Sequence, residues 1–143
     1  MNQLKKVLVG AFVVFMGYSF AQGVTGDNQG EALKPKFQMG LDSLTIAWPT
    51  ADEKGGILGS IGINLGLGVS YRSYFEPLYP QRGAVYWEAG TVLLIVPAYV
   101  GVGYDYRFDR HFYVGGGVNL APLALLAGTW PIYPSIHLGA YLY

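Results

Sequence analysis

The sequence predicts an all-β fold, specifically a small antiparallel up-and-down transmembrane β-barrel. Three observations lead to this prediction. Several segments alternate apolar residues with small or polar ones at a period of two, which is typical of strands and not of helices. Charged residues make up only 13% of the 143 residues, about half of the roughly 25% found in soluble domains. No segment beyond residue 21 offers the roughly 18 consecutive apolar residues of a membrane-spanning helix.

The composition also excludes several functional classes. The chain has no cysteine, which excludes a disulfide framework and the usual zinc modules. Its formal net charge is zero, whereas a nucleic-acid-binding domain normally carries a basic excess, so we expect no nucleic-acid partner. Hydrophobic residues make up 52% of the chain, which excludes a disordered protein.

Residues 1–21 have the features of a cleaved export signal. Lys5 and Lys6 precede an apolar run over 7–20, which is shorter than the roughly 20 residues of a membrane helix. The run ends near small residues of the kind that signal peptidase recognises. An uncleaved N-terminal anchor is the alternative. We expect residues 22–35, which are polar and rich in glycine, to form a flexible leader.

The β-barrel domain is expected over 36–143, where the alternation directly predicts six strands. The first, 36–47, alternates only partly. The second, 57–75, is the most regular, with aliphatic or aromatic residues at most odd positions and small or polar ones at most even positions. A tilted membrane strand needs only about 9–11 residues. This segment is therefore either one long strand or a pair that contains a turn near Asn64–Gly66.

Four more strands follow the same pattern. The segment 84–96 alternates around Glu88 and becomes apolar on both faces, whereas 98–108, 111–121 and 132–143 alternate throughout. The intervening segments are rich in proline, glycine, aspartate or other charged residues, which favour turns. The predicted connections are 49–56, 76–83, the surroundings of Pro97, Asp109–Arg110 and 122–131.

The expected strand count is higher than the number of strands that the pattern shows. Known single-chain barrels of this kind begin at about eight strands, so we predict eight, with the extra strands inside 57–75 and 121–129. The alternative is a homo-oligomer in which several chains complete one barrel. An even strand number puts both chain ends on the periplasmic side, and the 48–56 connection is then expected on the outer side.

The composition of the two strand faces predicts which one points outward. The non-apolar face carries glycine, serine, asparagine and tyrosine instead of the lysine and glutamate of a water-facing sheet. Small residues suit a narrow barrel interior, so we expect the aliphatic face to meet lipid. Aromatic residues near strand ends predict a girdle at two rims, although aromatics also favour strands in general. The girdle residues are Phe75, Trp87, Phe108 and Phe112 at one rim, and Trp48 and Trp130 at the other.

The C-terminus adds a resemblance. The last strand ends in Tyr141 and Tyr143, and the sequence resembles the small bacterial outer-membrane β-barrel proteins, whose closing strand ends in an aromatic signal. The resemblance implies an outer-membrane location in a diderm bacterium, with membrane lipid and the barrel-insertion machinery as partners. In this chain the two tyrosines share a face with His137, and not with the aliphatic Leu138 and Leu142.

Few residues are candidates for catalysis. Ser135 and His137 are two apart on one strand and so point the same way, and Glu88 lies on another strand. If the three approach inside the barrel, they form a Ser-His-Glu set similar to that of the outer-membrane lipid A deacylases. The alternative is a hydrogen-bonded interior network, which buried polar groups require. We expect no enzyme, with lipid hydrolysis by this set as the alternative.

The remaining candidates concern the lumen. Arg72, Glu88, Asp105 and Arg107 lie on the inward face and are expected to form compensating pairs that plug it, with an ion path as the alternative. Val92, Leu94 and Val96 share a face with Glu88 and suggest a pocket for a hydrophobic small molecule. The two histidines have no third ligand at a recognisable spacing, so we expect neither a metal site nor a cofactor.

The function expected from the sequence is that of a small outer-membrane barrel with a structural, adhesive or passive-transport role and a largely plugged lumen. One alternative is a membrane-barrel enzyme or carrier that acts on lipid or another hydrophobic ligand. The other is a soluble periplasmic β-barrel that binds a hydrophobic ligand inside.

Overall fold

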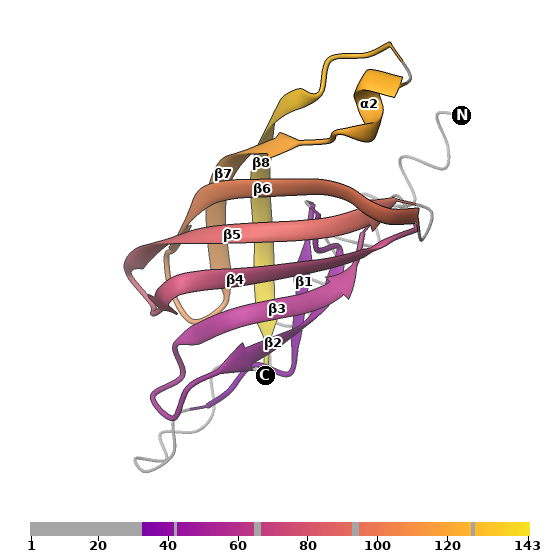
Figure 1. Cartoon of the computed structure of the whole chain (residues 1–143). Helices are drawn as coiled ribbons and strands as arrows, with labels where there is room; N and C mark the ends of the chain where they lie inside the picture. Colours follow the sequence, from indigo (N-terminus) through magenta and orange to yellow (C-terminus); the bar gives the residue numbers. More distant parts are fainter. Residues whose placement is uncertain (1–32, 42, 65–66, 93–94, 127) are drawn as a thin grey trace, which may run out of the picture. The chain divides into compact units, whose positions relative to one another are not determined.

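A computed structural model describes residues 33–41, 43–64, 67–92, 95–126 and 128–143, with side chains for all of these except 92 and 95–98. This part of the chain consists of antiparallel strands and one short helix (Figure 1). The strands are β1 (Phe37–Gly40), β2 (Ile46–Ala51), β3 (Ile57–Ile63), β4 (Val69–Leu78), β5 (Arg82–Val92), β6 (Ile95–Arg107), β7 (Phe112–Leu120) and β8 (Ile132–Leu142). The helix α2 (Leu123–Leu126) lies between β7 and β8.

The eight strands form one closed barrel in sequence order. Each strand pairs with the next, and β1 closes the barrel on β8 from Phe37 opposite Leu142 to Gly40 opposite Gly139. This architecture confirms the predicted all-β class and the antiparallel eight-stranded barrel. Because a single chain closes the sheet, strands from other copies are not needed to complete it.

Two strands that the alternation did not resolve come from the first two predicted segments. The segment 57–75 contains the predicted turn, since β3 ends at Ile63 and β4 begins at Val69. The Asn64 side chain stabilises this reversal by accepting a hydrogen bond of 2.9 Å from the Gly68 amide. The segment 36–47 is likewise divided, and its second half continues to Ala51 as β2. Strands as short as β1 carry too few alternations to be recognised.

Two predicted boundaries are wrong. The expected turn near Pro97 lies earlier, because Val92 pairs with Ile95 and Pro97 is inside β6. The described residues of 121–129 hold α2 and no strand. There the turn bonds follow a helical pattern, such as the Ala124 amide donating to the Ala121 carbonyl at 3.0 Å.

The strand order assigns every connection to one of two ends. We call the end where β1 begins and β8 ends the terminal end, and the other the distal end. The connections 52–56, 79–81 and 108–111 lie at the terminal end, and the remaining four connections lie at the distal end. The 48–56 connection was expected on the side opposite the chain ends. This expectation is wrong because the first segment contains two strands, which reverses the direction of everything after it.

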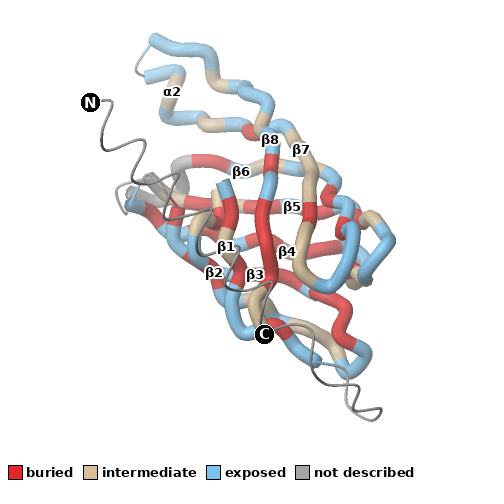
Figure 2. The backbone as a smooth tube through the Cα atoms, turned by 180° about the vertical axis from the view of Figure 1, so that it is seen from behind, coloured by how far each residue is buried: buried red, intermediate tan, exposed pale blue. Residues whose placement is uncertain are grey.

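The barrel is apolar outside and polar inside. On β3, Ile61 is 51% exposed while its neighbour Ser60 is 2% exposed. The same contrast holds on β6 between Val102, which is 58% exposed, and Asp105, which is fully buried. Figure 2 shows buried and exposed positions alternating along the strands. The two faces are therefore oriented as the sequence predicted, with small and polar residues toward the lumen.

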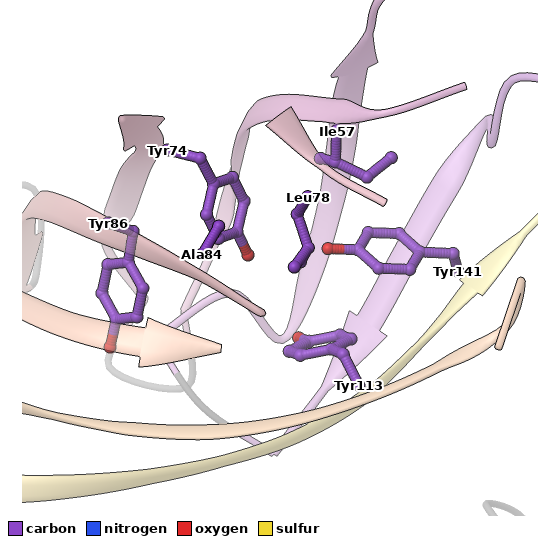
Figure 3. Close-up of a cluster of buried hydrophobic side chains, with 7 residues drawn as sticks. All are labelled: Ile57, Tyr74, Leu78, Ala84, Tyr86, Tyr113 and Tyr141. Carbon is purple, nitrogen blue, oxygen red and sulfur yellow. The ribbon is translucent and has the colours of Figure 1, made fainter. Parts of the chain in front are cut away.

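A cluster of buried rings and aliphatic chains fills the lumen toward the terminal end (Figure 3). Its members are Ile57, Tyr74, Leu78, Ala84, Tyr86, Tyr113 and Tyr141. Ile57 was expected on the outer face with the other odd residues of its segment. It points inward because β3 has one extra residue opposite β2, where Thr50 pairs with Gly59 but Ala51 pairs with Ile57, and one extra residue moves a side chain to the other face.

Candidate functional site in the barrel lumen

The centre of the lumen holds one guanidinium between two carboxylates. Arg72 on β4 donates to Glu88 Oε2 from Nη2 at 2.8 Å and from Nε at 3.1 Å. Its Nη1 donates to Asp105 Oδ2 at 3.0 Å. All three side chains are fully buried, so each charge depends on these partners to offset its desolvation. The guanidinium also lies over the Tyr86 ring, 4.3 Å from its centroid.

The fourth predicted member of this network lies apart. Arg107 donates to main-chain carbonyls of the terminal-end loops, including Gly55 at 3.3 Å and Arg110 at 2.7 Å, and to the Tyr143 hydroxyl. Of the predicted lumen charges, the structure therefore brings Arg72, Glu88 and Asp105 together. Arg107 instead joins the connections at the terminal end.

His137 and Ser135 on β8 extend the central network toward the distal end. His137 Nε2 lies 3.0 Å from the Ser135 hydroxyl oxygen, and its Nδ1 lies 3.2 Å from Asp105 Oδ1. The Tyr86 hydroxyl lies 3.0 Å from the same Nδ1. The structure thus joins the predicted serine and histidine, but the carboxylate next to the histidine is that of Asp105. Glu88 instead binds Arg72 and accepts a hydrogen bond from Ser43 at 2.7 Å.

Glycines on β7 explain why Asp105 reaches His137. Asp105 on β6 pairs with Gly115 on β7, and Gly115 pairs with His137 on β8. A Cβ at Gly115 would collide with the Asp105 carboxylate, so the missing side chain leaves room for contact across the intervening strand. The signal that could have identified Asp105 is the inward glycine between two inward polar residues.

Two further hydrogen-bonded groups line the lumen. Toward the distal end, Asn64 donates to Ser70 at 3.0 Å, and the hydroxyls of Ser70 and Tyr99 lie 2.6 Å apart. Elsewhere Ser60 donates to Gln38 at 2.6 Å, and Gln38 donates to the Tyr113 hydroxyl at 2.7 Å. These hydrogen bonds satisfy buried polar groups, which would destabilise the fold if they had no partner. Within the described residues, Glu88 Oε1 is a buried oxygen that finds no such partner.

The other predicted site residues are placed as follows. The side chains of Val92, Leu94 and Val96 lie outside the described residues, so the hydrophobic pocket keeps the status of a prediction. Over the described residues, no three His, Cys, Asp or Glu side chains are grouped so that they could hold a metal ion.

The girdle residues Phe75, Trp87, Phe108 and Trp130 are exposed, and Phe112 is half-buried. Trp87 does not lie at the predicted rim, because it pairs with Val102 in the middle of β5 and β6. Trp48 is exposed as well, but it does not share a rim with Trp130. It packs beside Phe37, the first residue of β1, with ring centroids 6.2 Å apart, while Trp130 lies in the distal connection. The cause is again the division of the first segment into two strands.

One ionisable contact outside the strands perturbs titration. In the 52–56 connection, the Tyr79 hydroxyl donates to Asp52 Oδ2 at 2.6 Å, and the Gly56 amide donates to Oδ1 at 2.8 Å. The Tyr79 hydrogen bond is the main reason that the pKa of Asp52 lies below its usual value. The same bond raises the pKa of Tyr79.

Comparison with known proteins gives no relative for this chain. No protein-family model matches it, no curated protein is significantly similar, and no solved structure is significantly similar. In the described part of the chain, no helix has both the length and the apolar character needed to cross a membrane.

Proposed function

We propose that the chain is an outer-membrane β-barrel protein with a largely plugged lumen and a structural, adhesive or passive-transport role. The observation that carries this proposal is the large apolar surface around the barrel. Every strand presents large hydrophobic side chains outward, for example Trp48 on β2, Val102 on β6 and Leu138 on β8, each between 46% and 58% exposed. A water-soluble barrel would expose a patch far larger than soluble monomers tolerate.

The distribution of charge supports the same proposal. Among the described residues, the charged side chains outside the lumen all lie at the terminal end: Lys34, Lys36, Asp52, Glu53, Lys54, Glu76, Arg82, Asp109 and Arg110. The outward surface of the strands between the two ends is uncharged in these residues. An apolar band next to a charged rim is the arrangement of a barrel in a bilayer. In this orientation the terminal end faces the periplasm.

The filled lumen limits what such a barrel can conduct. Arg72 with its two carboxylate partners fills the centre of the lumen, and the tyrosine rings fill the half toward the terminal end. We therefore expect passive transport, if the protein performs it, to require displacement of this network. The polar interior also disfavours the soluble carrier of a hydrophobic ligand, because buried polar side chains such as Arg72, Asp105 and His137 form hydrogen bonds inside the lumen.

Cysteine scanning tests the membrane proposal directly, because the chain has no cysteine of its own. Single cysteines at Ile61, Val102 and Val118 would probe the outward face, and a cysteine at Glu76 would serve as the charged-rim control. In intact membranes we expect a water-soluble maleimide to label Glu76→Cys but not the other three, and detergent to restore their labelling. Recovery of the protein in the soluble periplasm without detergent would contradict the proposal.

A further inference from the structure

The lumen network contains the arrangement that activates a serine hydroxyl. Ser135 Oγ, His137 Nε2, His137 Nδ1 and Asp105 Oδ1 follow one another through contacts of 3.0 Å and 3.2 Å. Both distances are within or near hydrogen-bond range for a nucleophile, its base and the group that orients the base. A carboxylate beside Nδ1 favours the tautomer with the proton on that nitrogen, so that Nε2 can accept the serine proton. The Tyr86 hydroxyl also lies 3.3 Å from Nε2.

Exposure along β8 shows how a substrate could reach the serine. Tyr133, Ser135 and His137 all point into the lumen, because they are two residues apart on one strand. Tyr133 is 39% exposed, Ser135 is half-buried and His137 is fully buried. Exposure therefore decreases along β8 from the distal end inward, from Tyr133 through Ser135 to His137. A nucleophile needs this combination of an accessible oxygen and a shielded base.

The surroundings of the entrance indicate the chemical class of substrate. The connection from β7 to β8 carries exposed Leu123, Leu125, Leu126 and Trp130, and residues 111–143 contain no charged Asp, Glu, Lys or Arg. An apolar connection at the distal end of the strand that carries Ser135 favours a neutral substrate with a hydrocarbon group. The buried carboxylates behind the histidine disfavour an anionic one.

We propose that Ser135 is the nucleophile of an acyl-transfer site that hydrolyses neutral carboxylic esters entering from the distal end. Ser135 Oγ bonds to the ester carbonyl carbon as its proton passes to His137 Nε2. The bond from that carbon to the alcohol oxygen then breaks, and the alcohol leaves with the proton from His137. Water repeats the sequence on the acyl-serine, which releases the carboxylic acid and restores the serine. Asp105 is a positioning residue, since it acts through the histidine.

This inference does not depend on the membrane proposal. The contacts that carry it lie within the barrel, and they are the same whether the outer surface meets lipid or another partner. It also differs from the set predicted from the sequence, because the carboxylate is Asp105 and the entrance is the lumen.

The first test is covalent labelling of the purified barrel in detergent micelles. We expect a fluorophosphonate to modify Ser135, as located by peptide mass spectrometry, and Ser135→Ala to lose this modification. Ser43→Ala is the matched control, because Ser43 is also half-buried at the distal end, while its described side-chain contacts are with Glu88 and Arg72 and not with a histidine. No adduct on the wild-type protein, or an adduct that persists in Ser135→Ala, would overturn the proposal.

The second test measures turnover of 4-nitrophenyl butyrate. We expect Ser135→Ala and His137→Gln to lower the rate about 100-fold or more, in line with the contribution of a general base. Asp105→Asn should lower kcat with little change in KM, because it disturbs the base and not the ester contacts. Heat-modifiable gel mobility identifies variants that fail to fold. Equal rates in folded wild-type protein and Ser135→Ala would contradict the proposal.

A third measurement remains informative if a variant loses activity for structural reasons. Ser135→Cys places a thiol next to His137, and we expect it to react with iodoacetamide at least about tenfold faster than Ser43→Cys because a neighbouring base promotes thiolate formation. Adding His137→Gln should remove the difference. Equal reactivity of the two cysteines, or a difference that survives His137→Gln, would show that the histidine does not activate this position.

Discussion

A lysine placed in the middle of the outer face should destabilise this barrel far more than it would destabilise a soluble protein. Val102 is the eighth residue of β6, which runs from Ile95 to Arg107, and its side chain is 58% exposed. At the midplane of a bilayer, lysine on a barrel surface costs about 2–4 kcal/mol. On a water-facing surface, the same substitution usually changes the free energy of unfolding by no more than about 0.5 kcal/mol.

The structure also supplies a matched control for Val102→Lys. Tyr106 points outward on the same strand, four residues nearer the terminal end, which is about 13 Å along the strand. With a tilt of about 40°, this distance corresponds to about 10 Å along the membrane normal, near the edge of an apolar band about 25 Å tall. The cost of a lysine charge there should fall to about 1 kcal/mol or less.

The assay is urea unfolding of protein refolded into lipid vesicles, followed by tryptophan fluorescence. We expect Val102→Lys to lower the free energy of unfolding by about 2 kcal/mol more than Tyr106→Lys does. Part of the cost of Tyr106→Lys comes from its lost edge contact with Phe108, where the ring centroids are 5.3 Å apart. If Val102→Lys changes stability by less than about 0.5 kcal/mol, the outer face is not in contact with lipid hydrocarbon and the reasoning is refuted.

Three further predictions concern the lumen and one loop. Arg72→Met should destabilise the barrel by about 3–5 kcal/mol, because it leaves two buried carboxylates unpaired; a loss below about 1 kcal/mol in vesicle unfolding would contradict this. Gly117→Ala should lower the free energy of unfolding by about 1–3 kcal/mol, since its Cβ would lie 2.6 Å from the Tyr86 hydroxyl. Gly116 faces outward, so Gly116→Ala should cost less in the same assay. Asp52 has a folded-state pKa below the ordinary 3.8, so it stabilises the fold above pH 3.8 and loses this contribution as the pH falls through the lowered value. Tyr79→Phe should weaken this acid dependence of stability in unfolding titrations. An unchanged pH profile would argue against the Tyr79–Asp52 hydrogen bond.

The sequence predicted the orientation of the strand faces because alternation is a local property. A period of two over 57–75 separates the two faces without knowledge of any partner strand. The same reasoning failed at Ile57, because a bulge depends on how β3 pairs with β2 and leaves no mark on the alternation. It also failed for the first segment, where β1 has only four residues and offers little pattern.

The central site was harder to predict because its members meet through the register. Ser135 and His137 were recognisable as neighbours from their spacing alone. From the sequence alone, the carboxylate partner of His137 could be any inward one, and Glu88 is one of the few available. The pairing of Asp105 with Gly115, and of Gly115 with His137, decides for Asp105. Such a contact spans three strands, so it requires the register of two pairs at once.

The many glycines and tyrosines of this chain have a common explanation in the width of the lumen. An eight-stranded barrel leaves room for one large side chain where two would collide. The structure meets this limit with direct cross-strand pairs of an inward tyrosine and an inward glycine. These pairs are Tyr86 with Gly103, Tyr99 with Gly90, and Tyr113 with Gly139.

In each pair a Cβ on the glycine would lie within 2.6 Å of ring atoms of its tyrosine, so the ring occupies the space that the glycine leaves empty. On β7, glycines leave space in the same way, so that Tyr86 and Asp105 both reach His137. The inward β7 glycines Gly115 and Gly117 therefore leave the space in which Asp105 and Tyr86 meet His137.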